Sequence, residues 1–121
     1  MVMRPSINCS MQLRARCAHS GGARRTVLIH GQYLREDQLE PLHRLDIFPA
    51  LYPMYTFYWG DWHRHSVASR ARAVNISPTG WLVMRGMKLS IQSDAQVTFP
   101  DSMQVMHSAI NRTTRAGFVI G

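Results

Sequence analysis

The residues whose types and spacing are best suited to bind a ligand lie in one polar turn, at Asn75, Ser77 and Gly80. Ser77-Pro78-Thr79-Gly80 fits a type I β-turn, because Ser suits the first position, Pro the second and Gly the fourth. The side chains of Asn75 and Ser77 can bond nearby backbone N–H groups. With Arg70 and Arg72 a few residues upstream, this turn has the groups to hold an anion. On this segment alone, we favour the other interpretation, an ordinary hairpin corner.

Two histidines form the other candidate cluster. On a strand, His63 and His65 would alternate onto one face with Asp61, as metal ligands would need. A metal site also needs a further ligand and groups that orient the ligands. We therefore predict no metal and interpret these histidines as part of a solvated, weakly basic face. Because no nucleophile–base pair or phosphate-binding glycine loop has the required spacing, we predict no catalytic residues and no enzyme.

Composition limits the size of the protein and the class of its partners. The 121 residues suffice for one domain, and 14 basic against 7 acidic residues give a net charge of +7. A basic chain favours an anionic partner such as a nucleotide, a nucleic acid or a lipid headgroup. The spacing of Cys9 and Cys17 is not that of a zinc site. Without a bilayer-length apolar run or a secretory signal pattern, we predict no membrane span and a cytoplasmic location.

The chain divides into a tail and one domain. Residues 1–22 lack periodicity and end in Ser-Gly-Gly, so they are predicted to be a flexible basic tail. Residues 23–121 are predicted to form the domain. Its first strand is expected at Thr26–Leu34, with Val27 and Ile29 on one face. His30, on the opposite face, is interpreted as a half-exposed strand residue.

Residues 35–68 are an atypical connection or insertion. Leucines at helical spacing predict a short helix or an irregular loop near Leu39, and two prolines argue against a central strand at Phe48–Pro53. The aromatic run Tyr55–Trp59 is predicted to be a strand whose rings fill the core. A platform for stacked bases and a partner-binding patch are the alternatives.

The second half of the chain consists of short segments separated by turn signals. Such spacing predicts an all-β barrel or sandwich. Strands are expected before the polar turn and, after it, at Trp81–Met84, Met87–Gln92, Ala95–Phe99, Met103–Ile110 and Gly117–Ile120.

One family pattern is similar to this region. The segment Arg72–Val83 resembles the Asn/Asp-x-Ser-x-x-Gly signature of PilZ domains, and the strands expected downstream follow in the same order. The resemblance implies a small six-stranded antiparallel β-barrel, here with a disordered N-terminal tail and a long aromatic-rich connection. It also implies the bacterial second messenger cyclic di-GMP as ligand, with no other cofactor.

The resemblance also implies which residues bind that ligand. The turn residues Asn75, Ser77 and Gly80 match the signature. The Arg-x-x-x-Arg segment of the family is not intact, and the adjacent pair Arg24 and Arg25 stands in its place. We therefore expect these arginines to fold over cyclic di-GMP against the turn, where guanidinium groups suit phosphates and guanine edges.

Three functions remain open at this stage. The first is a PilZ-like regulator that binds cyclic di-GMP and passes the signal on through contacts with a protein partner. The second is a degenerate PilZ-like interaction module that binds no nucleotide. The third, which we rank lowest, is a basic barrel for single-stranded nucleic acid.

Overall fold

A run of branched apolar residues after Arg25 forms the first strand, β1 (Val27–His30). The computed structural model describes residues 25–67 and 70–121. The predicted tail, residues 1–22, and Arg24 lie outside the described residues.

The first strand leads into a β-α-β unit. The chain passes through a 3₁₀ helix η1 (Glu36–Gln38) and helix α2 (Leu39–Arg44) to strand β2 (Phe48–Leu51). β1 and β2 are parallel, with Val27 opposite Phe48 and His30 opposite Leu51. The short helix predicted near Leu39 is confirmed. A parallel pair needs such a crossover, because the chain must return to the starting edge of the sheet.

A longer crossover joins β2 to the third strand, β3 (Ser90–Ile91), which pairs with β2 in parallel and gives the sheet order β1-β2-β3. This crossover is helical throughout its regular segments, and one more helix follows β3. In chain order these helices are α3 (Met54–Trp62), the π-helix η2 (His63–Val67), α4 (Arg70–Ala73), α5 (Thr79–Met84) and α6 (Ser102–Asn111).

The prediction of a six-stranded antiparallel barrel is wrong. The strands of the described residues form an open, parallel, three-stranded sheet. The segments predicted as strands at Tyr55–Trp59, Trp81–Met84 and Met103–Ile110 are helical. The ends of the predicted strands at Ala95–Phe99 and Gly117–Ile120 take part only in isolated bridges, Ala95–Thr98 and Thr113–Val119.

A proline lies in the central strand, against expectation. Phe48 N–H donates to Thr26 O at 2.9 Å and Leu51 O accepts from Gln92 N–H at 3.0 Å, so residue 48 faces β1 and residue 51 faces β3. By alternation Pro49 faces β3, whose pairing begins one residue later, at Ala50 opposite Ser90. The N–H that proline lacks would therefore point beyond the start of β3, and no ladder bond is lost.

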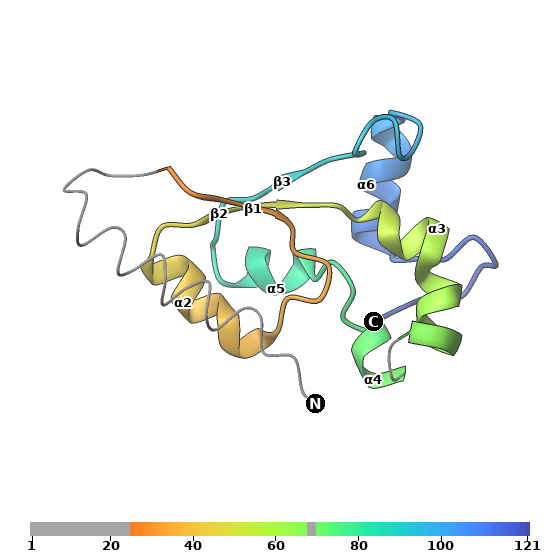
Figure 1. Ribbon diagram of the computed structural model, residues 1–121, viewed down its shortest axis with the longest axis horizontal. Coiled ribbons are helices and arrows are strands. Elements are labelled where there is room, and N and C mark those ends of the chain that lie inside the picture. The colour runs from red at the N-terminus through yellow and green to blue at the C-terminus, as the bar shows by residue number, and fades with distance from the viewer. Residues whose placement is uncertain (1–24, 68–69) are drawn as a thin grey trace.

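Helices α2 and α5 cover one face of the sheet (Figure 1). The residues inside this layer are apolar and come from both helices, from β2 and from the adjoining loops. They are Leu34, Leu39, Leu42, Ile47, Leu51, Leu82 and Met87. On the other face Val27, Ile29 and Phe48 are exposed.

A second cluster lies where the strands end. In Figure 1 the carboxyl ends of the strands point toward α3 and α6. Tyr52, Met54 and Val105 are buried there, and Tyr55 and Trp59 pack against them. This packing agrees with the core-filling interpretation of the aromatic run. It also forms a wall beside the carboxyl ends of the sheet.

Candidate functional site

The carboxyl ends of β1, β2 and β3 bring polar side chains together. In open parallel sheets this edge is where ligands bind, because the loops that leave the strands converge there. β1 ends at His30, β2 runs into Tyr52, and Asp94 follows β3 closely.

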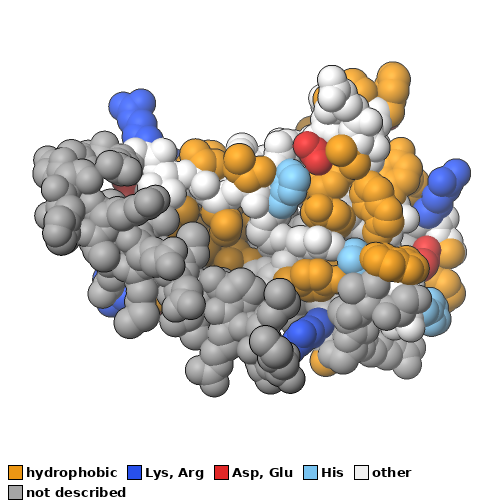
Figure 2. All heavy atoms as spheres, in the orientation of Figure 1, with side chains coloured by type: hydrophobic (Ala, Val, Ile, Leu, Met, Phe, Trp, Pro, Cys, Tyr) orange, Lys and Arg blue, Asp and Glu red, His pale blue; other side chains and the backbone are white. Residues whose placement is uncertain are grey.

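His30 and Asp94 form the centre of this cluster. Their Nε2 and Oδ2 atoms are 3.6 Å apart, and the two side chains are 34% and 32% exposed. Both residues have left-handed backbone angles, with φ of +69° and +49°. Non-glycine residues adopt this conformation at some cost, and such strain gathers at functional sites. Figure 2 shows a histidine and an acidic side chain next to each other on this face, among hydrophobic side chains.

Aromatic rings line one side of the pair. The ring centroid of His30 lies 5.6 Å from that of Tyr52 and 6.1 Å from that of Tyr55. The Tyr52 hydroxyl donates to Thr98 Oγ1 at 3.1 Å, and Thr98 in turn donates to the carbonyl oxygen of Ser93. Burial raises the pKa of Tyr52, so this hydroxyl remains a donor at neutral pH. The loop that carries Asp94 is thereby tied to the end of β2.

A buried histidine lies further along the same wall. Tyr55, Trp59 and His63 recur at intervals of four residues, so they occupy one face of the helical segment. His63 Nε2 lies 2.7 Å from Gln32 Nε2, and His63 Nδ1 lies 2.6 Å from the Tyr33 hydroxyl oxygen. Burial lowers the pKa of His63, which favours the neutral ring.

The turn at Asn75, Ser77 and Gly80 has a different geometry from the one predicted. Ser77 is fully buried; its hydroxyl donates to Tyr52 O at 2.9 Å and its N–H donates to Gln32 O at 3.0 Å. Asn75 is half-buried, and Gly80 is exposed within α5. These two hydrogen bonds connect the crossover between β2 and β3 to the segments that follow β1 and β2.

The backbone carbonyl oxygens of this turn accept hydrogen bonds from the side chain of Arg112. The Arg112 guanidinium donates to the carbonyl oxygens of Val74, Ile76, Ser77 and Ile120, at distances from 2.7 to 3.0 Å. Burial lowers the pKa of Arg112, but a guanidinium stays charged at neutral pH. The carbonyl oxygens of Ser77 and its neighbours are thus already engaged by a basic side chain, which differs from a cradle of free N–H donors.

The structure does not bring Arg25 to this turn. Arg25 precedes the amino end of β1, whereas Ser77 is bonded to Gln32, beyond its carboxyl end. The four-residue strand between them spans about 13 Å. Arg24, the other predicted ligand-binding arginine, lies outside the described residues.

His63 and His65 do not share the face that a strand would give them. Both belong to the π-helix, where His63 is buried and His65 is exposed. The Asp61 carboxylate accepts from Ala116 N–H at 3.2 Å. Within residues 25–67 and 70–121, no three His, Cys, Asp or Glu side chains gather closely enough to hold a metal ion.

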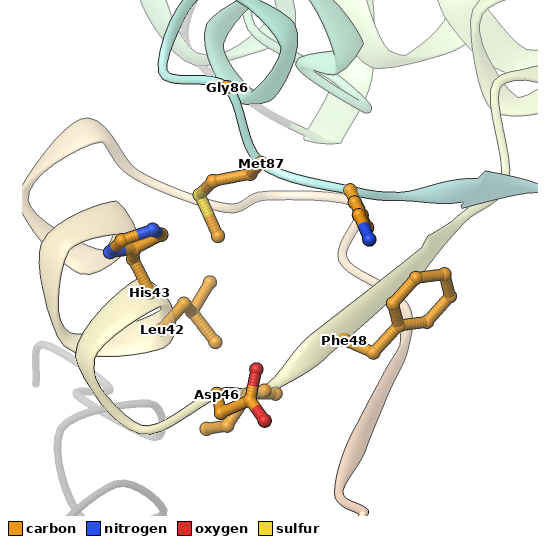
Figure 3. A pocket seen from close by; sticks show the side chains of 8 residues that line it. Leu42, His43, Asp46, Phe48, Gly86 and Met87 are labelled. Carbon is orange, nitrogen blue, oxygen red and sulfur yellow. The ribbon is translucent and has the colours of Figure 1, made fainter.

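A pocket of about 330 Å³ lies at the opposite end of the sheet. Leu42, His43, Asp46 and Met87 line it beside Phe48, the first residue of β2 (Figure 3). It therefore lies at the amino end of the strand. Because parallel sheets place their sites at carboxyl ends, we assign the candidate site to the His30–Asp94 edge.

A family model for the amidohydrolase family matches residues 11–120. The chain belongs to the amidohydrolase family. Searches of curated proteins and of solved structures found no significant match.

Membership of the amidohydrolase family corrects the functional predictions. The resemblance to PilZ domains is wrong, and so is a regulatory domain that binds cyclic di-GMP, because the family matches almost the whole chain. The prediction that the protein is not an enzyme is also wrong, since amidohydrolases are hydrolytic enzymes. The Asn-x-Ser-x-x-Gly spacing is too short to identify a family without the fold around it.

Sequence reasoning missed both members of the candidate pair in this amidohydrolase-family chain. His30 is predicted to be a half-exposed strand residue, and Asp94 lies between the strands expected at Met87–Gln92 and Ala95–Phe99. The signal that could have found them is a polar residue at or shortly after the end of each of two strands, but this signal indicates a shared site only when the strands are parallel. In the described residues no helix is long and apolar enough to cross a membrane.

Proposed function

We propose that this chain takes part in the hydrolysis of an amide-type C–N bond at the carboxyl edge of its parallel sheet. The observation that carries the proposal is the His30–Asp94 pair, 3.6 Å apart at this edge, in a chain of the amidohydrolase family. Both side chains are partly exposed, so water and substrate can reach them.

Amide hydrolysis needs a group that takes a proton from water. As the water oxygen bonds to the carbonyl carbon, the His30–Asp94 pair accepts the proton that water loses. When the C–N bond breaks, the pair returns a proton to the leaving nitrogen. A histidine beside a carboxylate suits this work, because the carboxylate orients the ring and stabilises its charged form. The separation of 3.6 Å can shorten when a substrate excludes water.

The aromatic wall favours one class of substrate. The half-buried ring of Tyr55 lies next to His30 and packs against Trp59 and the buried Tyr52. Rings of this kind bury large apolar areas and prefer to pack against other rings. We therefore expect substrates with an aromatic or branched apolar group beside the scissile bond.

The test uses the full chain and a panel of p-nitroanilides with aromatic, aliphatic and acidic acyl groups. We expect turnover of aromatic members and its loss in Asp94→Asn and His30→Asn. Asn tolerates left-handed backbone angles, so both variants should fold. Asp46→Asn is the matched control, because Asp46 also has a positive φ, of +50°, but lies at the other end of the sheet. No turnover by the wild-type chain, or full activity in both site variants, would contradict the proposal.

We also propose a cytoplasmic location and a protein partner for this chain. A cytoplasmic location is supported by the composition of the chain, in which no bilayer-length apolar run occurs. A protein partner is supported by the exposed sheet face at Val27, Ile29 and Phe48, because parallel sheets are normally covered on both faces.

A further inference from the structure

Helix α6 packs one of its faces against the rest of the protein. Val105 and Ser108 are buried, and Val105 belongs to the apolar cluster that contains Met54. The Ser108 hydroxyl donates to Met54 Sδ at 3.6 Å. The carbonyl oxygen of Ala109 accepts from the Thr79 hydroxyl at 3.0 Å. These contacts determine which face of α6 points away from the protein.

The outward face of α6 carries large apolar side chains. Met103, Met106 and Ile110 are 71%, 46% and 75% exposed. At about 100° per residue, the three side chains lie within about 60° of one another, on the side of the helix away from Val105. We call these three residues the α6 stripe. The helix lies at the opposite end of the molecule from α2 (Figure 1).

The α6 stripe lies on a helix without charge. No Asp, Glu, Lys or Arg occurs in α6, although the chain as a whole has a net charge of +7. Two copies of a basic chain repel each other wherever their basic surfaces meet. The outward face of α6 lets two copies approach without bringing like charges together, and it offers no charge to attract an anionic partner.

The spacing of the α6 stripe makes it complementary to itself. Met103 and Ile110 are seven residues apart, and Met106 lies beside the midpoint between them. If two stripes meet antiparallel about a two-fold axis, Met103 of each copy lies opposite Ile110 of the other, and the two Met106 side chains meet near the axis. A two-fold interface requires such self-complementarity. Antiparallel helices also place opposite ends of their dipoles together.

The exposed apolar area is large enough for a dimer of ordinary size. With about 200 Å² for each fully exposed large side chain, the α6 stripe exposes about 400 Å². A standard interface buries about 800 Å² on each partner, of which about 450 Å² is apolar. Val97 and Phe99, in the loop that precedes α6, are 59% and 77% exposed and add to this apolar surface.

We propose that two copies of this chain associate through the α6 stripe, with α6 of one copy packed antiparallel against α6 of the other. The interface has the three stripe residues at its centre, where apolar side chains spaced three and four residues apart pack between those of the facing helix. The association requires no catalysis, so it is independent of the proposed hydrolysis.

Sedimentation velocity of the full chain tests the association at concentrations up to about 100 µM, where a dimer with a micromolar dissociation constant is populated. We expect the wild type to dimerise. Met103→Glu should weaken dimerisation at least about 100-fold, because its carboxylate would be buried against Ile110 of the second copy. A glutamate in the first turn of α6 suits the helix dipole, so this variant should fold.

Met84→Glu is the matched control. Met84 is 76% exposed and lies in α5, outside the α6 stripe. This variant introduces the same charge and should dimerise like the wild type. A monomeric wild type would overturn the inference and leave the stripe to a different protein. Equal dimerisation of Met103→Glu and the wild type, or equal loss in Met103→Glu and Met84→Glu, would also overturn it.

A second measurement locates the two-fold axis. In a chain with Cys9→Ser and Cys17→Ser, Met106→Cys should form a disulfide with its own copy when diamide is the oxidant, because the two side chains meet near the axis. Met84→Cys in the same background should stay unlinked. Equal cross-linking at both positions, or no cross-linking at position 106, would overturn the antiparallel arrangement.

Discussion

The His30 imidazole lies 3.6 Å from the Asp94 carboxylate, although His30 ends β1, Asp94 follows β3, and β2 lies between these two strands. Two groups that act as one unit should not have additive effects on the rate. The contact joins the end of β1 to the loop that follows β3 across the carboxyl edge of the sheet, so the pair depends on the complete sheet.

The first prediction is therefore a non-additive cycle. His30→Asn and Asp94→Asn should each lower kcat/KM about 10²–10⁴-fold, the range of acid–base catalysis. The double variant should lose no more than the worse single variant, as measured with one p-nitroanilide under fixed conditions. Multiplication of the two losses would show that the residues act separately.

The second prediction concerns Arg112. Replacement by Met removes the donors of four carbonyl oxygens, and we expect a loss of about 2–4 kcal/mol in the free energy of unfolding, because the acceptors of three part-buried hydrogen bonds and one exposed hydrogen bond would lose their partner. Urea unfolding is the measurement. Arg112→Lys should recover only part of the loss, since an ammonium cannot reach four acceptors.

Arg115→Met is the control for this series, because the Arg115 side chain is exposed. Its unfolding free energy should stay within about 0.5 kcal/mol of the wild type. An Arg112→Met variant as stable as the control would show that the four hydrogen bonds do not stabilise the fold.

The third prediction compares two glycines. A Cβ at Gly60 would lie 2.7 Å from Ile120 Cδ1 and 2.8 Å from Thr114 Cγ2, so Gly60→Ala should destabilise by about 1–3 kcal/mol. A Cβ at Gly80 meets nothing within 4 Å, and Gly80→Ala should stabilise by up to about 1 kcal/mol, because Ala favours helix α5. Thermal unfolding of both variants tests this. A loss of stability in Gly80→Ala would contradict the prediction.

The fourth prediction is a pH dependence of stability. Burial holds the pKa of His63 below its unfolded value of about 6.5. The unfolded state then binds more protons as the pH falls through about 6.5, so stability is present above this pH and is lost below it. The titratable groups that face the ring are Tyr33 and Tyr55, which are uncharged in this range.

Urea unfolding between pH 7.5 and pH 5.5 measures this loss. His63→Gln should have a flatter pH profile than the wild type, because the variant has no ring to protonate. His65→Gln, which changes an exposed histidine in the same π-helix, should keep the wild-type profile. Identical profiles for the wild type and His63→Gln would contradict the prediction.

Part of the fold could be predicted from local patterns. The branched residues of Val27–His30 form a strand, and the leucines after Glu36 form a short helix. Signals for two further helices were present but were interpreted as strands. Tyr55, Trp59 and His63 recur every four residues, and the Asp101 carboxylate accepts from Met103 and Gln104 N–H as the N-cap of α6.

The remainder depended on contacts between distant segments. The β-propensity of Tyr55–Trp59 predicted a strand, but packing of Tyr55 and Trp59 against the end of the sheet stabilises a helix instead. The type I turn predicted at Ser77–Gly80 is wrong, because Thr79 and Gly80 already belong to helix α5. The structural role of this segment could not be predicted, because the carbonyl oxygens of Ile76 and Ser77 accept hydrogen bonds from Arg112, which is distant in the sequence.

The sequence alone determined a basic chain of 121 residues whose first strand and first helix follow from neighbouring residues. Only the tertiary structure decided that the strands are parallel and that His30 meets Asp94. The physical reason is that propensity and spacing act over a few residues. Whether a connection is a short hairpin or a crossover that returns the chain to the starting edge determines the strand direction, and with it which strand ends share an edge.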